Sequence, residues 1–111
     1  METALETAAS RMLTLEDIGF TTDASPEVVR ACCDQIARRI ASLYEAGTLT
    51  WFAADTIANN IYELMILHCG DRVPDFAWDL FLAFDESEID NRGDSYARAR
   101  IAQLNEKYGA S

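Results

Sequence analysis

The stretch SPEVVRACCDQIARRIASLYEAGTLTWFAADTIANNIYELM, residues Ser25–Met65, decides the fold because it predicts two amphipathic helices joined by a short turn. Ser25 is a typical N-cap residue, and Pro26 is typical of a first helical position. Gly47 stands where a left-handed residue often ends a helix. The apolar residues between these signals recur at helical spacing and form one stripe: Val29, Cys32, Cys33, Ile36, Ile40, Leu43 and Tyr44.

The second helix of this stretch follows the turn at once, with Thr50 as its N-cap. Tyr62 and Ile66 lie off its main stripe, so we expect it to be the most buried helix. The main stripe consists of Ala54, Ile57, Ala58, Ile61, Leu64 and Met65. Because only a few residues separate the two helices, they should pair as an antiparallel hairpin.

Further helices are predicted on both sides of this hairpin. Residues 3–15 predict a short first helix, and Pro74 and Asp75 open another that reaches about Glu86. A last helix is expected from about Asp94, and its predicted inner face comprises Tyr96, Ala99, Leu104 and Tyr108, with Ile101 flanking it. The prediction is therefore one all-α domain, residues 1–111, built as a bundle of about five helices around the central hairpin.

The chain is strongly acidic: its 111 residues include 19 Asp and Glu but 9 Lys and Arg, for a net charge of −10. Binding to nucleic acid is not expected, because that binding needs cationic groups that displace counterions from the phosphates. An anionic membrane surface is disfavoured for the same reason. If the charge serves binding, the partner is a basic protein. The alternative, that the charge only keeps the protein soluble, stays open.

The protein is expected in the cytoplasm. The N-terminal METALETAASRM carries acids and does not look like a secretory signal. No stretch approaches the roughly 20 apolar residues of a membrane helix. The three cysteines, Cys32, Cys33 and Cys69, are an odd number with two adjacent, which does not favour a disulfide framework.

No metal, cofactor or catalytic residue is predicted. With Gly93 at position 6 of a calcium-binding loop, Arg92 would stand at position 5 and Ala99 at position 12, where carboxylates are needed. Adjacent helical residues point about 100° apart, so Cys32 and Cys33 do not suit one zinc ion. His68 is the single histidine, and no orienting group or phosphate-binding glycine loop accompanies it. The chain is therefore not expected to be an enzyme.

The stretch FAWDLFLAFDESEID, residues 76–90, is the candidate interaction surface. With Asp75 it carries six acids and no basic residue. On a helical wheel Ala77, Leu80, Phe81 and Phe84 point to the core, while the acids lie opposite and look solvated. An aromatic anchor beside acids would suit a basic partner. The predicted partner-binding residues are Trp78, Asp79, Leu82, Asp85, Glu86, Glu88 and Asp90. Alternatively, Trp78 packs under a neighbouring helix and the acids are only a wet surface.

Around LYEAGTLTWFAADTIANNIYELM the chain resembles small acidic helical bacterial immunity proteins, such as those that neutralise colicin-type nuclease toxins. The resemblance covers Ile36–Leu67, under a third of the chain. It consists of a helix, a glycine turn, a short capping stretch and a helix with an aromatic residue near its start. It implies an acidic protein that binds and blocks a basic enzyme, and it transfers no individual contact residue.

Two functional hypotheses follow. The first is an acidic protein–protein interaction module, for example of the immunity or inhibitor type, that binds a basic partner. The alternative is a structural or regulatory protein without catalytic activity that forms a homodimer. In that case the helix that is apolar on more than one side would complete its burial between two copies.

Overall fold

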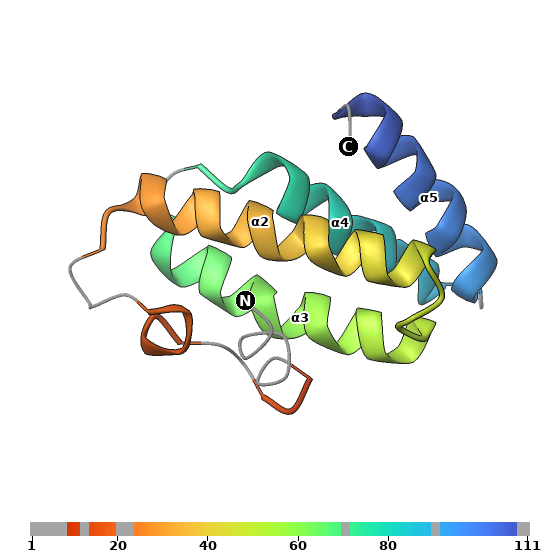
Figure 1. Ribbon diagram of the computed structural model, residues 1–111, viewed down its shortest axis with the longest axis horizontal. Coiled ribbons are helices and arrows are strands. Elements are labelled where there is room, and N and C mark those ends of the chain that lie inside the picture. Colours follow the sequence, from red (N-terminus) through yellow and green to blue (C-terminus); the bar gives the residue numbers. More distant parts are fainter. Residues whose placement is uncertain (1–8, 12–13, 20–23, 70–71, 90–91, 109–111) are drawn as a thin grey trace.

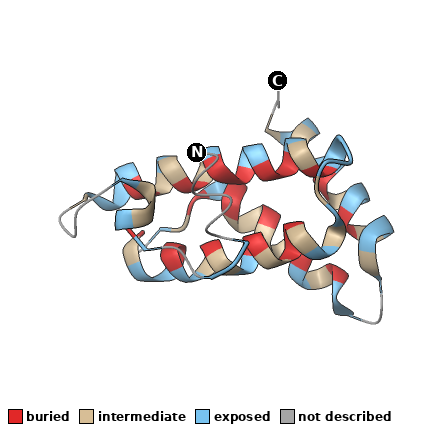
Figure 2. Cartoon of the chain, turned by 60° about the horizontal axis from the view of Figure 1, so that its bottom comes forward, coloured by how far each residue is buried: buried red, intermediate tan, exposed pale blue. Residues whose placement is uncertain are grey.

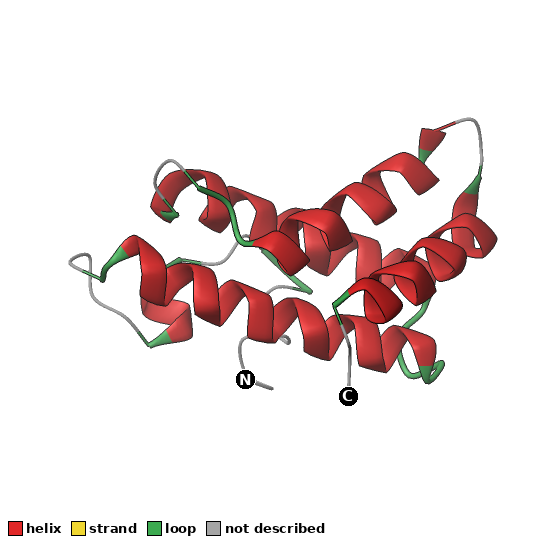
Figure 3. Cartoon of the chain, turned by 90° about the horizontal axis from the view of Figure 1, so that it is seen from above, coloured by secondary structure: helices red, strands yellow, loops and turns green. Residues whose placement is uncertain are grey.

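The computed structural model describes residues 9–11, 14–19, 24–69, 72–89 and 92–108. Its elements are a short 3-10 helix η1 (Glu16–Ile18) and four α-helices: α2 (Pro26–Glu45), α3 (Trp51–His68), α4 (Asp75–Ser87) and α5 (Gly93–Lys107). The described ranges contain no strand (Figure 3), so the all-α prediction is confirmed. The described residues form four α-helices, where about five were expected. Of the first predicted helix, residues 3–8 and 12–13 lie outside the described residues, and residues 9–11 and 15 form turns and a bend.

The hairpin of α2 and α3 is built as its sequence predicts. The Ser25 hydroxyl accepts a hydrogen bond from the Val28 amide at 3.3 Å, and the Thr50 hydroxyl accepts one from the Ala53 amide at 3.1 Å. Between the helices, Gly47 adopts a φ of 80°, which only glycine adopts without strain. The two helices therefore run side by side in opposite directions (Figure 1).

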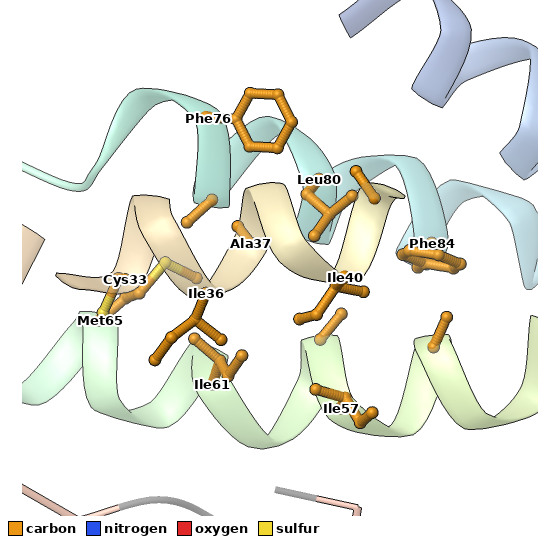
Figure 4. Packing of buried hydrophobic residues seen from close by; sticks show 14 of the residues in the cluster. Cys33, Ile36, Ala37, Ile40, Ile57, Ile61, Met65, Phe76, Leu80 and Phe84 are labelled. Carbon is orange, nitrogen blue, oxygen red and sulfur yellow. The ribbon is translucent and has the colours of Figure 1, made fainter. Parts of the chain in front are cut away.

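The core lies where α2, α3 and α4 pack against one another, and α2 faces α3 with one side and α4 with another (Figure 4). On one side Ile36 and Ile40 face Ile57 and Ile61, and all six residues of the predicted α3 stripe are buried. On the other side α4 contributes the buried residues Phe76, Ala77, Leu80, Ala83 and Phe84. Each large apolar side chain buried here contributes about 1.5–3 kcal/mol.

Side chains from α2 close the ends of the neighbouring helices. The Asp34 carboxylate accepts a hydrogen bond from the Ala77 amide at 2.8 Å, at the start of α4. The Arg30 guanidinium donates to the Cys69 carbonyl at 2.9 Å, at the end of α3. Both bonds satisfy backbone groups that a helix end leaves open, so α2 fixes where α3 ends and α4 begins.

The expectation that α3 is the most buried helix is wrong. Its outer side leaves Phe52 73 %, Ile66 49 % and Leu67 66 % exposed. The buried residues of all helices lie on their inner sides (Figure 2). Only one side of α3 packs against α2 and α4, so its additional apolar residues stay at the surface.

The predicted inner face of α5 is partly wrong. The buried residues are Ala97, Ile101 and Leu104, whereas Ala99 is exposed. Tyr96 and Tyr108 lie at the rim, where arginine and lysine side chains cover their rings. α5 has too few large apolar residues to define one stripe. The predicted inner face therefore depended on the choice among its alanines, and it included Ala99, whereas the buried alanine is Ala97.

Candidate functional site

The acidic side of α4 is not open to solvent along its length, because α5 packs against it. The Asp79 carboxylate accepts a hydrogen bond from the Tyr108 hydroxyl at 2.6 Å and lies 3.3 Å from the Lys107 ammonium. Two turns further on, Glu86 pairs with Arg100. Since α4 and α5 run in opposite directions, the seven-residue spacing on each helix brings both pairs into register. The expectation that Asp79 and Glu86 are solvated is therefore wrong.

Contact with Asp79 changes the proton affinity of both its partners. Its hydrogen bond is the main cause that raises the pKa of Lys107, and likewise the main cause that raises the pKa of Tyr108. The Asp79 side chain is 24 % exposed and that of Lys107 is 64 % exposed. Such an exposed pair is screened by water and contributes little to the stability of the fold.

Trp78 packs against α3, as the alternative interpretation of this helix proposed. Its ring centroid lies 5.9 Å from that of Tyr62 and 5.6 Å from that of Phe81. The rings of Tyr62 and Phe81 are themselves stacked at 4.2 Å. Trp78 and Leu82 are both half-buried. Trp78 was expected to anchor a partner, but part of its ring is covered by contacts within the fold.

Two of the predicted surface acids remain exposed, Asp85 and Glu88, at the end of α4. Neither forms an ion pair with a described lysine or arginine. Asp90, the last predicted residue, lies outside the described residues. The acidic surface that is free of cationic partners is therefore smaller than predicted and sits at one end of the bundle.

The end of α4 meets the start of α3. The Trp51 indole donates a hydrogen bond to the Ser87 hydroxyl at 2.9 Å, and that hydroxyl donates to the Phe84 carbonyl at 2.6 Å. These bonds hold the two helix ends together. We call this region, defined by Trp51, Phe52, Asp55, Asp85, Ser87, Glu88 and Ile89, the α3–α4 junction.

Asp55 is the unusual residue of the junction. It is 8 % exposed, and its Oδ1 atom has no hydrogen-bond partner. Burial raises the pKa of its carboxyl group to about 7, and the negative charge of Glu88, a hydrogen bond with Glu88 and the charge of Asp85 add to the effect. A buried acceptor left without a partner costs about 1–3 kcal/mol.

Sequence reasoning missed Asp55 because an acid early in a helix is ordinarily favoured by the helix dipole. A signal was present, since Asp55 is adjacent to Ala54 and one turn before Ala58, both in the buried stripe of α3. An acid inside an apolar stripe predicts a buried carboxyl group.

The cysteines are suited to packing and not to nucleophilic chemistry. Burial raises the pKa of Cys33, Cys69 and Cys32, so their thiols stay protonated at neutral pH. His68 lines a shallow pocket of about 300 Å³ together with Thr14, Leu15 and Glu16. Within the described ranges, no three His, Cys, Asp or Glu side chains are arranged to hold a metal ion.

Comparisons with protein-family models, curated proteins and solved structures found no match to this chain. The resemblance of Ile36–Leu67 to immunity proteins therefore stays a prediction. In the part of the chain that the structure describes, no helix combines the length and the hydropathy needed to cross a membrane.

Proposed function

We propose that this protein is a small acidic protein–protein interaction module that binds a basic protein, in the manner of an immunity or inhibitor protein. The observation that carries the proposal is that some of its acidic side chains are paired with cationic side chains and others are not. The net charge is −10, yet Asp79 and Glu86 are paired by α5 while Asp85 and Glu88 are exposed without a described cationic partner. The uncompensated charge at the α3–α4 junction favours this end of the bundle as the docking surface.

Such a surface would attract a basic partner over a distance and orient it. A concentration of negative charge accelerates the encounter with a basic partner and penalises the encounter with an acidic one. The same charge repels nucleic acid and anionic membranes. The resemblance to immunity proteins supports a basic enzyme as the partner. Three free cysteines suit a reducing compartment, and we place the protein in the cytoplasm.

Affinity capture from native lysate tests the proposal, with the bound proteins identified at about 50 mM and about 500 mM salt. A basic protein is expected at low salt and should be released at high salt, because screening shortens the reach of surface charges.

Binding of that protein, once purified, should be lost in the double variant Asp85→Lys/Glu88→Lys. The matched control Glu63→Lys/Glu106→Lys reverses two other exposed acids and should bind more strongly than the junction variant. Equal loss in both variants would argue against the junction.

A second candidate function is a homodimeric structural or regulatory module. It is favoured by the exposed apolar side chains of α3, Phe52, Ile66 and Leu67. Light scattering at high protein concentration tests it. A dimer that Ile66→Ser/Leu67→Ser converts to a monomer would support it, and a strict monomer would contradict it.

A further inference from the structure

We propose that the α3–α4 junction binds one arginine side chain of the basic partner, whose guanidinium pairs with the carboxylate of Asp55. This inference rests on the proposed function and adds the group recognised and the residue that recognises it.

The first observation is the unpaired oxygen. Asp55 is 8 % exposed, its Oδ1 accepts no hydrogen bond, and none of the ion pairs in the described ranges includes it. Buried polar atoms almost always have a partner, and an exception needs an explanation. A ligand that supplies a donor on binding provides one.

The second observation is that the fold does not supply that donor from the junction. The Trp51 indole N–H is committed to the Ser87 hydroxyl at 2.9 Å, and that hydroxyl donates to the Phe84 carbonyl. The charged groups that influence Asp55 come from α4, and both are acids, Glu88 and Asp85. When Asp55 is protonated it can share that proton with Glu88, but once it is ionised the two carboxylates repel each other. A cationic donor for the ionised form therefore has to come from outside the described residues.

The surroundings favour arginine among the possible cations. Phe52 precedes Asp55 by one helical turn and is 73 % exposed, so its ring can cover the face of a planar group. A guanidinium offers five donors in a rigid fork, enough for Asp55 and Glu88 together, whereas an ammonium is a strongly hydrated point charge. A metal ion is disfavoured, because no described group of three ligands has the required arrangement.

The affinity of the junction for an arginine side chain should depend on pH. The pKa of Asp55 is raised to about 7, so the carboxyl group must lose its proton before it can pair with a guanidinium. The groups that face it, Glu88 and Asp85, are both acids. Affinity should therefore rise about tenfold between pH 6 and pH 8, following the ionised fraction of Asp55.

The test is a titration of the full 111-residue chain with acetyl-hexa-arginine amide, followed by amide NMR shifts at about 20 mM salt and pH 8. We expect the shifts to concentrate at residues 51–56 and 84–89. Hexa-lysine should bind at least threefold more weakly, and the neutral hexa-citrulline peptide should not bind. Asp55→Asn should weaken binding about tenfold and remove the dependence on pH. The control Asp75→Asn, at an exposed acid near the start of α4, should change affinity less than twofold.

A second variant keeps the proposal testable if Asp55→Asn alters the fold. Phe52→Ala removes an exposed ring and should weaken hexa-arginine binding at least threefold. The inference is overturned if shifts spread over all acidic surfaces and Asp55→Asn matches Asp75→Asn. In that result the peptide still binds, so the proposed function survives. Equal binding of hexa-lysine overturns the choice of arginine, and no binding of any basic peptide overturns both proposals.

Discussion

Replacement of Asp55 by Asn should stabilise the protein, and only above about pH 5. Asparagine keeps the shape of the side chain and cannot ionise. In the native protein the Asp55 pKa is raised from 3.8 to about 7, chiefly by burial and then by Glu88. The folded state therefore holds a proton more tightly than the unfolded state does. The stability that this proton provides is fully present below about pH 4 and is lost as the pH rises through 7.

The size of the effect follows from that pKa shift. A rise of roughly three units corresponds to about 4 kcal/mol if the group is fully shielded from water. Glu88, which contributes to the shift, is exposed, and water screens its charge, so we take about 2 kcal/mol. For a chain of this size that difference corresponds to a Tm increase of roughly 8 °C.

Urea unfolding of both proteins, followed by circular dichroism at about pH 4 and about pH 8, measures the difference. We expect equal stability near pH 4 and an advantage of about 2 kcal/mol for Asp55→Asn near pH 8. Asp75→Asn serves as the control, and its effect should be within about 0.5 kcal/mol at both pH values. An Asn variant that is less stable near pH 8, or whose advantage is the same at both pH values, would show that ionisation of a buried Asp55 does not destabilise the fold.

Three further predictions concern the fold. Thr50→Ala removes the hydroxyl that accepts the Ala53 amide at 3.1 Å and should cost about 1 kcal/mol in chemical unfolding. Tyr108→Phe removes the 2.6 Å hydrogen bond to Asp79 and should cost about 1 kcal/mol, and an unchanged unfolding midpoint would show that α5 does not depend on this bond. In the folded protein a thiol reagent should modify Cys32 first, because the other two cysteines are buried, and equal rates at all three thiols would contradict that packing.

The hairpin could be predicted from the sequence because every local signal agrees. The N-caps Ser25 and Thr50, the glycine at position 47 and the apolar stripes of α2 and α3 all specify the same two helices. The α3 stripe is long and strictly periodic, so its buried residues follow directly from helix geometry.

The partners of the α4 acids could not be predicted in the same way. A helical wheel shows which side of α4 is polar, but not which helix packs against that side. The contacts of Asp79 with Tyr108 and of Glu86 with Arg100 depend on the antiparallel placement of α5. α5 has three buried residues, Ala97, Ile101 and Leu104, and so few positions give little periodic signal in the sequence.

The environment of Asp55 depends on two helix ends that are distant in the sequence. The position of the residue in the α3 stripe predicts burial, but only the fold shows that Glu88 and Asp85 are its charged neighbours. The predicted surface therefore contained two residues of the junction, Asp85 and Glu88, and lacked the residue at its centre.

The measurement that tests the central claim most directly is a ¹³C NMR titration of the Asp55 carboxyl carbon, with and without hexa-arginine. We expect a midpoint near pH 7 for the free protein. The peptide should move that midpoint to lower pH, because the guanidinium stabilises the ionised carboxylate. A midpoint near 4 in the free protein would show that Asp55 is not buried as described, and a midpoint near 7 that the peptide does not move would show that no guanidinium pairs with it.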